Sequence, residues 1–289
     1  MTGLLHVTTL SAVEAGILQS RLREAEFEFG CAPHAVFRAW SHGVHVTYYE
    51  SGKLVVQGKG TPAFVTAYLG GIEEPPRDPL VDLAVVGSDE SGKGDYFGPL
   101  VVAACLVGPE NRGLLEELRV TDSKKAPDPR ILVAERLLKE ALPHAVVTLR
   151  PEEYNRAYAR TLNLNILLGR AHARAIEGVL RQKRCRVVLS DKFGDERFIR
   201  DELGALGREV ELLQKPRAEA HPAVAAASFL ARAEFLHTLR ELEEETVAPL
   251  PRGAGTAVEE AAREIVRLQG RDVLARVAKL HFKITERVA

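Results

Sequence analysis

The chain contains few cysteines and no long apolar run, and both absences narrow its class. Its three cysteines, Cys31, Cys105 and Cys185, are odd in number, far apart and without metal-ligand spacing. They predict small, reduced core residues of a cytoplasmic protein rather than a disulfide framework or a zinc site. No apolar run approaches ~18 residues, so we expect no membrane span. The N-terminus lacks a basic start and a long apolar region, so we expect no signal peptide.

The chain also has almost no excess charge of either sign. It carries 39 Lys and Arg against 40 Asp and Glu, a net charge of −1. Any contact with a polyanion such as nucleic acid must therefore come from local patches. The 289 residues, 46% of them apolar, are enough for one large or two moderate domains with real cores.

The pattern along the chain predicts two domains. Residues 73–80 form the expected linker, because three prolines and four charges in seven residues oppose both helix and strand. Residues 1–72 before it predict a small N-terminal α+β domain, and residues 81–289 a larger α/β domain with helices at its C-terminal end. In the smaller domain we expect helices near 10–29 and 61–69, and strands near 35–40, 44–49 and 54–57.

Aromatic and basic side chains of the small domain are typical of a platform for a nucleic-acid backbone. The alternative is that the aromatics belong to the core, as aromatics in strands usually do. The residues concerned are Trp40, Tyr48, Tyr49, Arg38, Lys53 and Lys59.

One stretch of the larger domain, Gly87–Leu100, combines acids with glycines between two apolar runs. Asp89 and Glu90 are adjacent, and they repel each other at the end of a buried strand unless a cation or hydrogen bonds compensate. The glycines that follow permit a sharp turn and a close approach to a ligand. The stretch predicts a metal-binding strand end beside a turn that touches a phosphate or sugar; an acidic hairpin turn without chemistry is the plain alternative.

The same residues also fit the spacing of a nucleotide-binding P-loop, with Gly87, Gly92 and Lys93 in place. Three features oppose that interpretation. Gly94 stands where a Ser or Thr should hold magnesium, the two acids would face phosphates, and a proline follows where a helix should begin.

Further acids follow apolar runs elsewhere in the larger domain. Asp191 comes directly after the predicted strand near 187–189, and Glu219 opens a helical region. Strand ends and the loops beside them are where ligands gather in an α/β sheet. If Asp89, Glu90, Asp191 and Glu219 converge, divalent ions must offset their repulsion, and oxygen ligands favour Mg²⁺ or Mn²⁺ over zinc. Two such ions catalyse in-line displacement at phosphorus. Strand-end aspartates are also common as turn residues, so spacing alone leaves convergence open.

These motifs resemble the type 2 ribonuclease H family. The resemblance rests on SDESGKGDYFGPLVVAA, TDSKK, the Asp191 strand end and AEAHPAVAAASFLAR. Three further features, the Gly-Lys-Gly form, the N-terminal extension with YYESGKLVVQG and the C-terminal AKLHFK, resemble the ribonuclease HIII branch. Its ribonuclease HII counterpart typically has Gly-Arg-Gly.

The resemblance implies a ribonuclease H-like mixed sheet flanked by helices, with an N-terminal domain resembling TATA-binding protein. It implies an endonuclease that hydrolyses the RNA strand of RNA–DNA hybrids with two divalent ions and leaves 5′-phosphate and 3′-hydroxyl ends. The alternative within the family is incision at single ribonucleotides in duplex DNA. The hybrid is the expected partner; we expect no membrane contact and no obligate protein partner, hence a monomer.

Carried over residue by residue, the resemblance assigns the catalytic and metal-binding acids to Asp89, Glu90, Asp191 and Glu219. Expected nucleic-acid contacts are Ser91, Gly92, Lys93, Gly94, Ser123 and Lys124, together with Tyr48 and Lys53 of the small domain.

The chain departs from the family pattern after the fourth acid. Ala220 stands where a small polar residue is usual, and Arg217 stands where a smaller residue is expected. Near the motifs, His221 is open to two interpretations: a proton shuttle, or a solvent-facing residue at a helix start. For His281 we expect a packed position or one near the nucleic acid, without a role as metal ligand.

Overall fold

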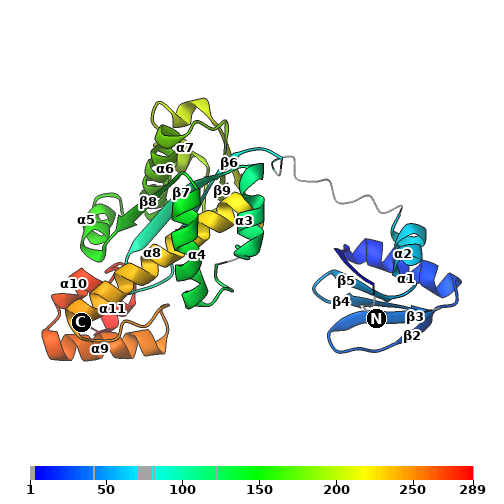
Figure 1. Cartoon of the computed structure of the whole chain (residues 1–289). Helices are drawn as coiled ribbons and strands as arrows, with labels where there is room; N and C mark the ends of the chain where they lie inside the picture. The colour runs from blue at the N-terminus through cyan, green and yellow to red at the C-terminus, as the bar shows by residue number, and fades with distance from the viewer. Residues whose placement is uncertain (1–3, 42, 71–79, 81, 122, 289) are drawn as a thin grey trace. The chain divides into compact units, whose positions relative to one another are not determined.

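The computed structural model describes residues 4–41, 43–70, 80, 82–121 and 123–288. The chain divides into two compact units, Met1–Arg77 and Asp78–Ala289 (Figure 1). Except for Leu80, the expected linker 73–80 lies outside the described residues, so its bounds stay a prediction. No helix in the described ranges is both long and apolar enough to cross a bilayer.

The first unit is a five-stranded antiparallel sheet with helices on one face. The strand order is β1-β5-β4-β3-β2, so the strand nearest the N-terminus pairs at one edge with the last. Two strands that the sequence did not predict, β1 and β2, form the edges. The elements are β1 (Leu5–Thr9), α1 (Ala12–Glu24), β2 (Glu28–Gly30), β3 (Ala35–Ser41), β4 (Val44–Tyr49), β5 (Lys53–Gly58), α2 (Thr61–Phe64) and the π-helix η1 (Val65–Leu69).

Burial alternates along the central strands of this sheet, as expected for a sheet covered on one face only. In β4, Val44, Val46 and Tyr48 are buried, while the residues between them are not. The buried side packs against α1, whose Leu18 and Leu22 are fully enclosed. The other face of the sheet is left open by the unit's own helices.

The second unit is built on a mixed sheet in the order β10-β9-β6-β7-β8. Strands β6, β7 and β8 are antiparallel neighbours, whereas β9 runs parallel to both β6 and β10. Their bounds are β6 (Val85–Ser91), β7 (Leu100–Val107), β8 (His144–Leu149), β9 (Val187–Asp191) and β10 (Glu211–Lys215).

Helices cover both faces of this sheet, giving three layers (Figure 1). On one face α8 lies along β6 and β7, with α4 packed against it, and on the other α6 crosses β7 and β8. The helices are η2 (Pro109–Asn111), α3 (Arg112–Glu117), α4 (Asp128–Ala141), α5 (Pro151–Thr161), α6 (Leu164–Gln182), α7 (Arg197–Arg200), η3 (Gly207–Glu209), η4 (Ala218–Ala220), α8 (Pro222–Thr246), α9 (Thr256–Gln269), α10 (Val273–Val277) and α11 (Ile284–Val288).

Helix α8 approaches β6 closely because neither element carries a large side chain at the crossing. A Cβ on Gly87 would lie 2.1 Å from the backbone carbon of Ala223. The alanine-dense start of the helix therefore meets the strand that carries the acids. The helix start and the strand end are thus held together by backbone contact.

Two sequence expectations are wrong. The apolar run before the acids, Leu80–Val86, is a strand only from Val85, and this strand continues through the acids, because Asp89 and Glu90 extend the ladder with β7. Of the three cysteines expected in the core, only Cys105 is buried; Cys31 of the first unit is exposed, and Cys185 is half-buried. Burial raises the pKa of the Cys105 thiol to about 12, as expected for an inert core residue.

Candidate active site at the edge of the second sheet

Two acids far apart in the sequence lie side by side at one edge of the second sheet. Strands β6 and β9 run parallel, with Ser88 opposite Ser190. The next residues, Asp89 and Asp191, therefore stand on neighbouring strands at the same carboxyl edge. In an open α/β sheet this edge is where ligands bind.

Electrostatics confirm that the acids in this place interact. Burial raises the pKa of Asp89 well above its usual range; the charge of Glu90 and, to a lesser degree, that of Asp191 act in the same direction. A hydrogen bond from the Glu90 backbone amide to Asp89 Oδ1, 2.8 Å long, lowers the pKa again, as does the charge of Lys124. These two effects do not outweigh burial and the neighbouring acids, so the carboxylate form of Asp89 is disfavoured unless a cation binds beside it.

Glu90 is held by two cationic or polar neighbours. Burial raises its pKa, but His172 and Lys93 together outweigh this, so that its pKa is lowered overall. Lys93 Nζ lies 3.3 Å from Glu90 Oε1, and His172 Nε2 lies 3.4 Å from Glu90 Oε2. His172 is fully buried on α6, within 2.6 Å of Ser88 Oγ through Nδ1 and stacked on Phe193.

His172 is the one site residue that sequence reasoning missed. Arg170 and Arg174 lie on the exposed side of its helix, whereas the histidine lies on the buried side. The only available signal was a polar residue among apolar positions of α6. Glu90 Oε2 and His172 Nε2 are buried without a well-formed hydrogen bond. A buried oxygen of this kind is suited to a further ligand.

The fourth acid, Glu219, reaches the same edge by a different route. The backbone amide of Ala218 donates to Asp191 Oδ1 at 3.0 Å, so η4 starts directly beside Asp191. Glu219 is the next residue and is half-buried. Within the described ranges, no three His, Cys, Asp or Glu side chains already form a group that could hold a metal ion.

The glycine turn follows the acids immediately and has no helix after it. Gly92 has φ +87° and is buried; a Cβ there would lie 2.1 Å from the Pro99 carbonyl oxygen. Gly94 is exposed, and a Cβ there would meet nothing within 4 Å. The chain then enters β7, a strand antiparallel to β6, which excludes the P-loop interpretation.

Of the other residues expected at this site, Lys124 and Ser91 are placed near the acids. Lys124 is close enough for its charge to lower the pKa of Asp89. Ser91, at the end of β6, and Ser123 are half-buried, and Asp122 between the expected loop residues lies outside the described part of the chain.

The two histidines differ in burial, because His221 is buried whereas His281 is exposed. His221 is buried, and its Nδ1 caps α8 by accepting a hydrogen bond from the Ala223 amide at 3.2 Å, so the solvent-facing interpretation is wrong. Its Nε2 lies 3.5 Å from the Leu80 carbonyl oxygen. His281 stacks on Tyr158, with ring centroids 4.5 Å apart.

In the first unit, Tyr48 does not fit the predicted nucleic-acid contact. Its ring is buried against Phe37, and its hydroxyl donates to the Leu10 carbonyl at 3.0 Å. The physical reason is strand alternation, which sends Tyr48 to the core and the adjacent Tyr49 to the open face. Lys53 precedes Leu54, the residue that pairs with Tyr48 across the β4–β5 hairpin, and it is exposed.

Comparison with known proteins identifies the class of the second unit. Residues 86–285 match the family model described as Ribonuclease HII, so this unit is a type 2 ribonuclease H domain. Residues 6–76 match a separate model described only as a domain of unknown function.

Whole-length relatives narrow the class further. Ribonuclease HIII of Chlamydia abortus is 38% identical, with 96% of this chain and 95% of that protein covered. Ribonuclease HIII of Chlamydia pneumoniae is 37% identical, with 98% and 97% covered. The chain therefore belongs to the ribonuclease HIII family.

Solved structures agree with this assignment. Bst-RNase HIII in complex with Mn²⁺ matches with a TM-score of 0.71 at 30% identity, covering 99% of this chain and 98% of that one. RNase H3 of Aquifex aeolicus matches with a TM-score of 0.58 at 29% identity, covering 96% and 100%. The matches confirm the expected fold, a ribonuclease H-like mixed sheet with a smaller N-terminal domain resembling TATA-binding protein, and the expected enzyme class, a ribonuclease H that hydrolyses phosphodiester bonds.

Proposed function

We propose that this protein hydrolyses the RNA strand of RNA–DNA hybrids endonucleolytically, leaving 5′-phosphate and 3′-hydroxyl ends. The observation that carries the proposal is the pair of neighbouring strand ends that places Asp89 and Glu90 beside Asp191. The adjacent glycine turn supports it, because such a turn lets a nucleic-acid strand come close to backbone amides.

Divalent ions fit this donor set. The pKa of Asp89 is raised because burial and the charges of two neighbouring acids disfavour its carboxylate form, and a bound divalent cation would favour that form. Asp89, Glu90 and Asp191 would hold Mg²⁺ or Mn²⁺, and Glu219 would complete the set by turning its half-buried side chain toward Asp191. Two bound ions supply the acidity that makes water a nucleophile near neutral pH and neutralise charge at the phosphate.

The remaining side chains of the site orient these acids and meet the substrate. Lys93 and His172 hold the two oxygens of Glu90, as groups behind a metal ligand commonly do. The turn Gly92–Gly94 exposes backbone to the strand near the scissile phosphate, where amides can sense a ribose 2′-hydroxyl. We expect Ser91, Ser123 and Lys124 to contact the backbone of the hybrid nearby.

The open face of the first sheet is the proposed platform for the hybrid. Trp40 and Arg38 of β3 share this face with Tyr49 and Lys53 at the far end of the β4–β5 hairpin. The Arg38 guanidinium lies 5.9 Å from the Trp40 ring centroid. Flat aromatic and basic groups of this kind bind nucleic-acid backbones without regard to sequence. This revises the sequence prediction: Tyr48 is replaced by Tyr49.

The deciding experiment is cleavage of an end-labelled RNA–DNA duplex with Mg²⁺, Mn²⁺ or chelator. We expect internal cuts in the RNA strand with either ion and none with chelator. A second duplex with one embedded ribonucleotide separates the alternative, which predicts incision there in preference to a continuous RNA stretch. Absence of cleavage of both duplexes in either ion contradicts the proposal.

Three further expectations complete this proposal. We expect the enzyme to act as a monomer. It works in the cytoplasm, where its substrate forms. The boundary between the domains lies within residues 73–80.

A further inference from the structure

A lysine at the C-terminal end of the chain is fully enclosed. Lys279 has no exposed surface. Its Nζ donates to the backbone carbonyl oxygens of Asp95 at 2.8 Å, Gly98 at 2.8 Å and Phe97 at 3.4 Å. An ammonium has three N–H donors, and three acceptors surround it. The Tyr154 ring, 5.9 Å from Nζ, faces the same charge.

All three carbonyls belong to the short segment that joins the glycine turn to β7. This segment, Asp95–Gly98, contains no helix and no strand ladder to satisfy its carbonyls. It begins one residue after Gly94, and the Asp95 amide also donates to the Gly92 carbonyl at 3.3 Å. Displacing the segment therefore displaces the turn proposed to meet the substrate.

Further hydrogen bonds tie the same segment to the C-terminal part of the chain. The Lys279 amide donates to Tyr96 O at 2.9 Å, and the Gly98 amide donates to Val277 O at 2.9 Å. The Tyr96 hydroxyl lies 3.2 Å from Thr285 Oγ1. The segment is thus clamped along its length by residues from the other end of the sequence.

The backbone around Lys279, which holds this segment, is itself hydrogen-bonded to α5. Asn155 donates to the carbonyls of Ala275 and Ala278 at 3.2 and 2.9 Å, and accepts a hydrogen bond from the Leu280 amide at 2.9 Å. These three bonds fix the backbone on both sides of Lys279.

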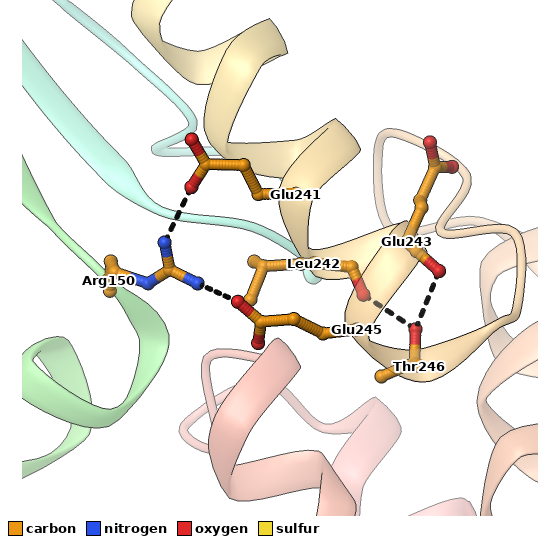
Figure 2. A network of polar contacts seen from close by, with 6 residues as sticks. All are labelled: Arg150, Glu241, Leu242, Glu243, Glu245 and Thr246. Atoms are coloured by element: carbon orange, nitrogen blue, oxygen red, sulfur yellow. Dashed lines mark hydrogen bonds and ion pairs between the residues drawn. The ribbon is translucent and has the colours of Figure 1, made fainter.

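The start of α5 is in turn tied to α8. Figure 2 shows Arg150 pointing between Glu241 and Glu245, with 2.7 Å separating it from each carboxylate. A chain of contacts therefore connects the glycine turn through Lys279 and Asn155 to the C-terminal half of α8. The N-terminal half of the same helix packs against β6, the strand that carries the acids.

We propose that Lys279 is a positioning residue, whose ammonium holds Asp95–Gly98 and thereby sets where Gly92–Gly94 meets the RNA strand. The inference rests on the proposed function, because it presumes that this turn contacts the substrate. Burial lowers the pKa of Lys279 to about 7, against the opposing charge of Asp95. Burial thus disfavours the charged ammonium of Lys279, and its hydrogen bonds to the three carbonyl oxygens compensate for this.

The test compares Lys279→Met and Lys279→Gln with wild type. Both replacements are one atom shorter than lysine; methionine offers no donor, whereas the glutamine amide offers two. Lys283→Met is the matched control, because Lys283 is exposed in the same C-terminal segment. Each variant is assayed on saturating RNA–DNA duplex well below its melting temperature, and amide hydrogen exchange is followed in peptides covering 92–98 and 85–90.

We expect kcat to follow the number of donors, falling about tenfold or more in Lys279→Met and less in Lys279→Gln, because small misplacement near the reacting bond is costly. KM should change less than about threefold, exchange should rise in 92–98 but not in 85–90, and Lys283→Met should match wild type. If Lys279→Met does not fold, Lys279→Gln carries the same comparison.

Two results overturn the inference. One is a folded Lys279 variant with wild-type kcat; the other is exchange that rises equally throughout the unit, since that is general destabilisation. An inactive wild type would instead refute the proposed function, so the two failures are distinguishable.

Discussion

The two glycines of the turn should respond to the same substitution in opposite ways. Gly92 is buried at φ +87°, with backbone and the Phe235 ring where a side chain would go; Gly94 is exposed, with open space around it. Alanine at both positions separates what the turn contributes to stability from what it contributes to substrate contact.

The structure sets the expected magnitudes. Alanine at a left-handed position costs roughly 1–2 kcal/mol, and at Gly92 its Cβ would also lie 2.1 Å from the Pro99 carbonyl oxygen. We expect Gly92→Ala to lose about 3 kcal/mol, a fall of roughly 6–12 °C in melting temperature for a unit of this size. Gly94→Ala should be neutral or gain about 0.4–1 kcal/mol, because it restricts only the unfolded chain.

Activity should not follow stability. Gly94→Ala places a methyl group in the space where the nucleic-acid strand is proposed to approach the backbone, so we expect kcat/KM on the hybrid to fall about tenfold or more. The assay pairs thermal melting of each variant with cleavage of labelled duplex at a temperature where both are folded. A Gly94→Ala enzyme with wild-type kcat/KM would refute the proposed contact, and a Gly92→Ala enzyme that melts like wild type would refute the packing argument.

Four further outcomes test the site. Asp191→Asn keeps the shape but removes a charge, so cleavage should fall about 100-fold or more with hybrid affinity unchanged by anisotropy; near-native turnover in Mg²⁺ contradicts the role. The pKa of Asp89 is higher in the folded than in the unfolded chain, so above pH 3.8 the unfolded chain binds fewer protons than the folded one. The free energy of unfolding of the metal-free protein should therefore fall as pH rises from 3.8 through the raised pKa. Saturating Mg²⁺ at neutral pH should raise the melting temperature of wild type, and Asp89→Asn should abolish both effects; a variant that melts like wild type across pH 4–8, with and without EDTA, would count against this. His172→Phe keeps an aromatic ring to stack on Phe193 but loses the polar contacts with Ser88 and Glu90, so it should lower kcat about tenfold and raise the Mg²⁺ concentration for half-maximal rate; an unchanged Mg²⁺ dependence would contradict the orienting role of His172. Deleting residues 1–72 should weaken hybrid binding at least about tenfold with kcat at saturation within about threefold, and unchanged affinity would show that the first unit is not the platform.

Much of the fold was predictable because local pattern determines it. The bounds of α9 follow from helical periodicity, and the alanines at the start of α8 predicted its close approach to a sheet. The glycine turn and the adjacent acids were recognisable because their chemistry is compressed into a few consecutive residues. The short edge strands β1 and β2 were missed, since a few half-exposed residues carry little pattern of their own.

The tertiary structure alone decided which residues meet. Asp191 reaches Asp89 only because β9 pairs in parallel with β6, and strand periodicity says nothing about which strands pair. The same holds for His172, enclosed by packing against the sheet, and for Lys279, whose partners lie near the turn at the other end of the second unit's sequence. Alternation showed that Tyr48 and Tyr49 face opposite ways, but only the helices packed on one side decide which of them is buried. The sequence by itself therefore determined which chemical groups this protein carries, because residue type is local. Packing between distant segments decided where those groups come together, because burial and charge coupling depend on neighbours that are far away in the sequence.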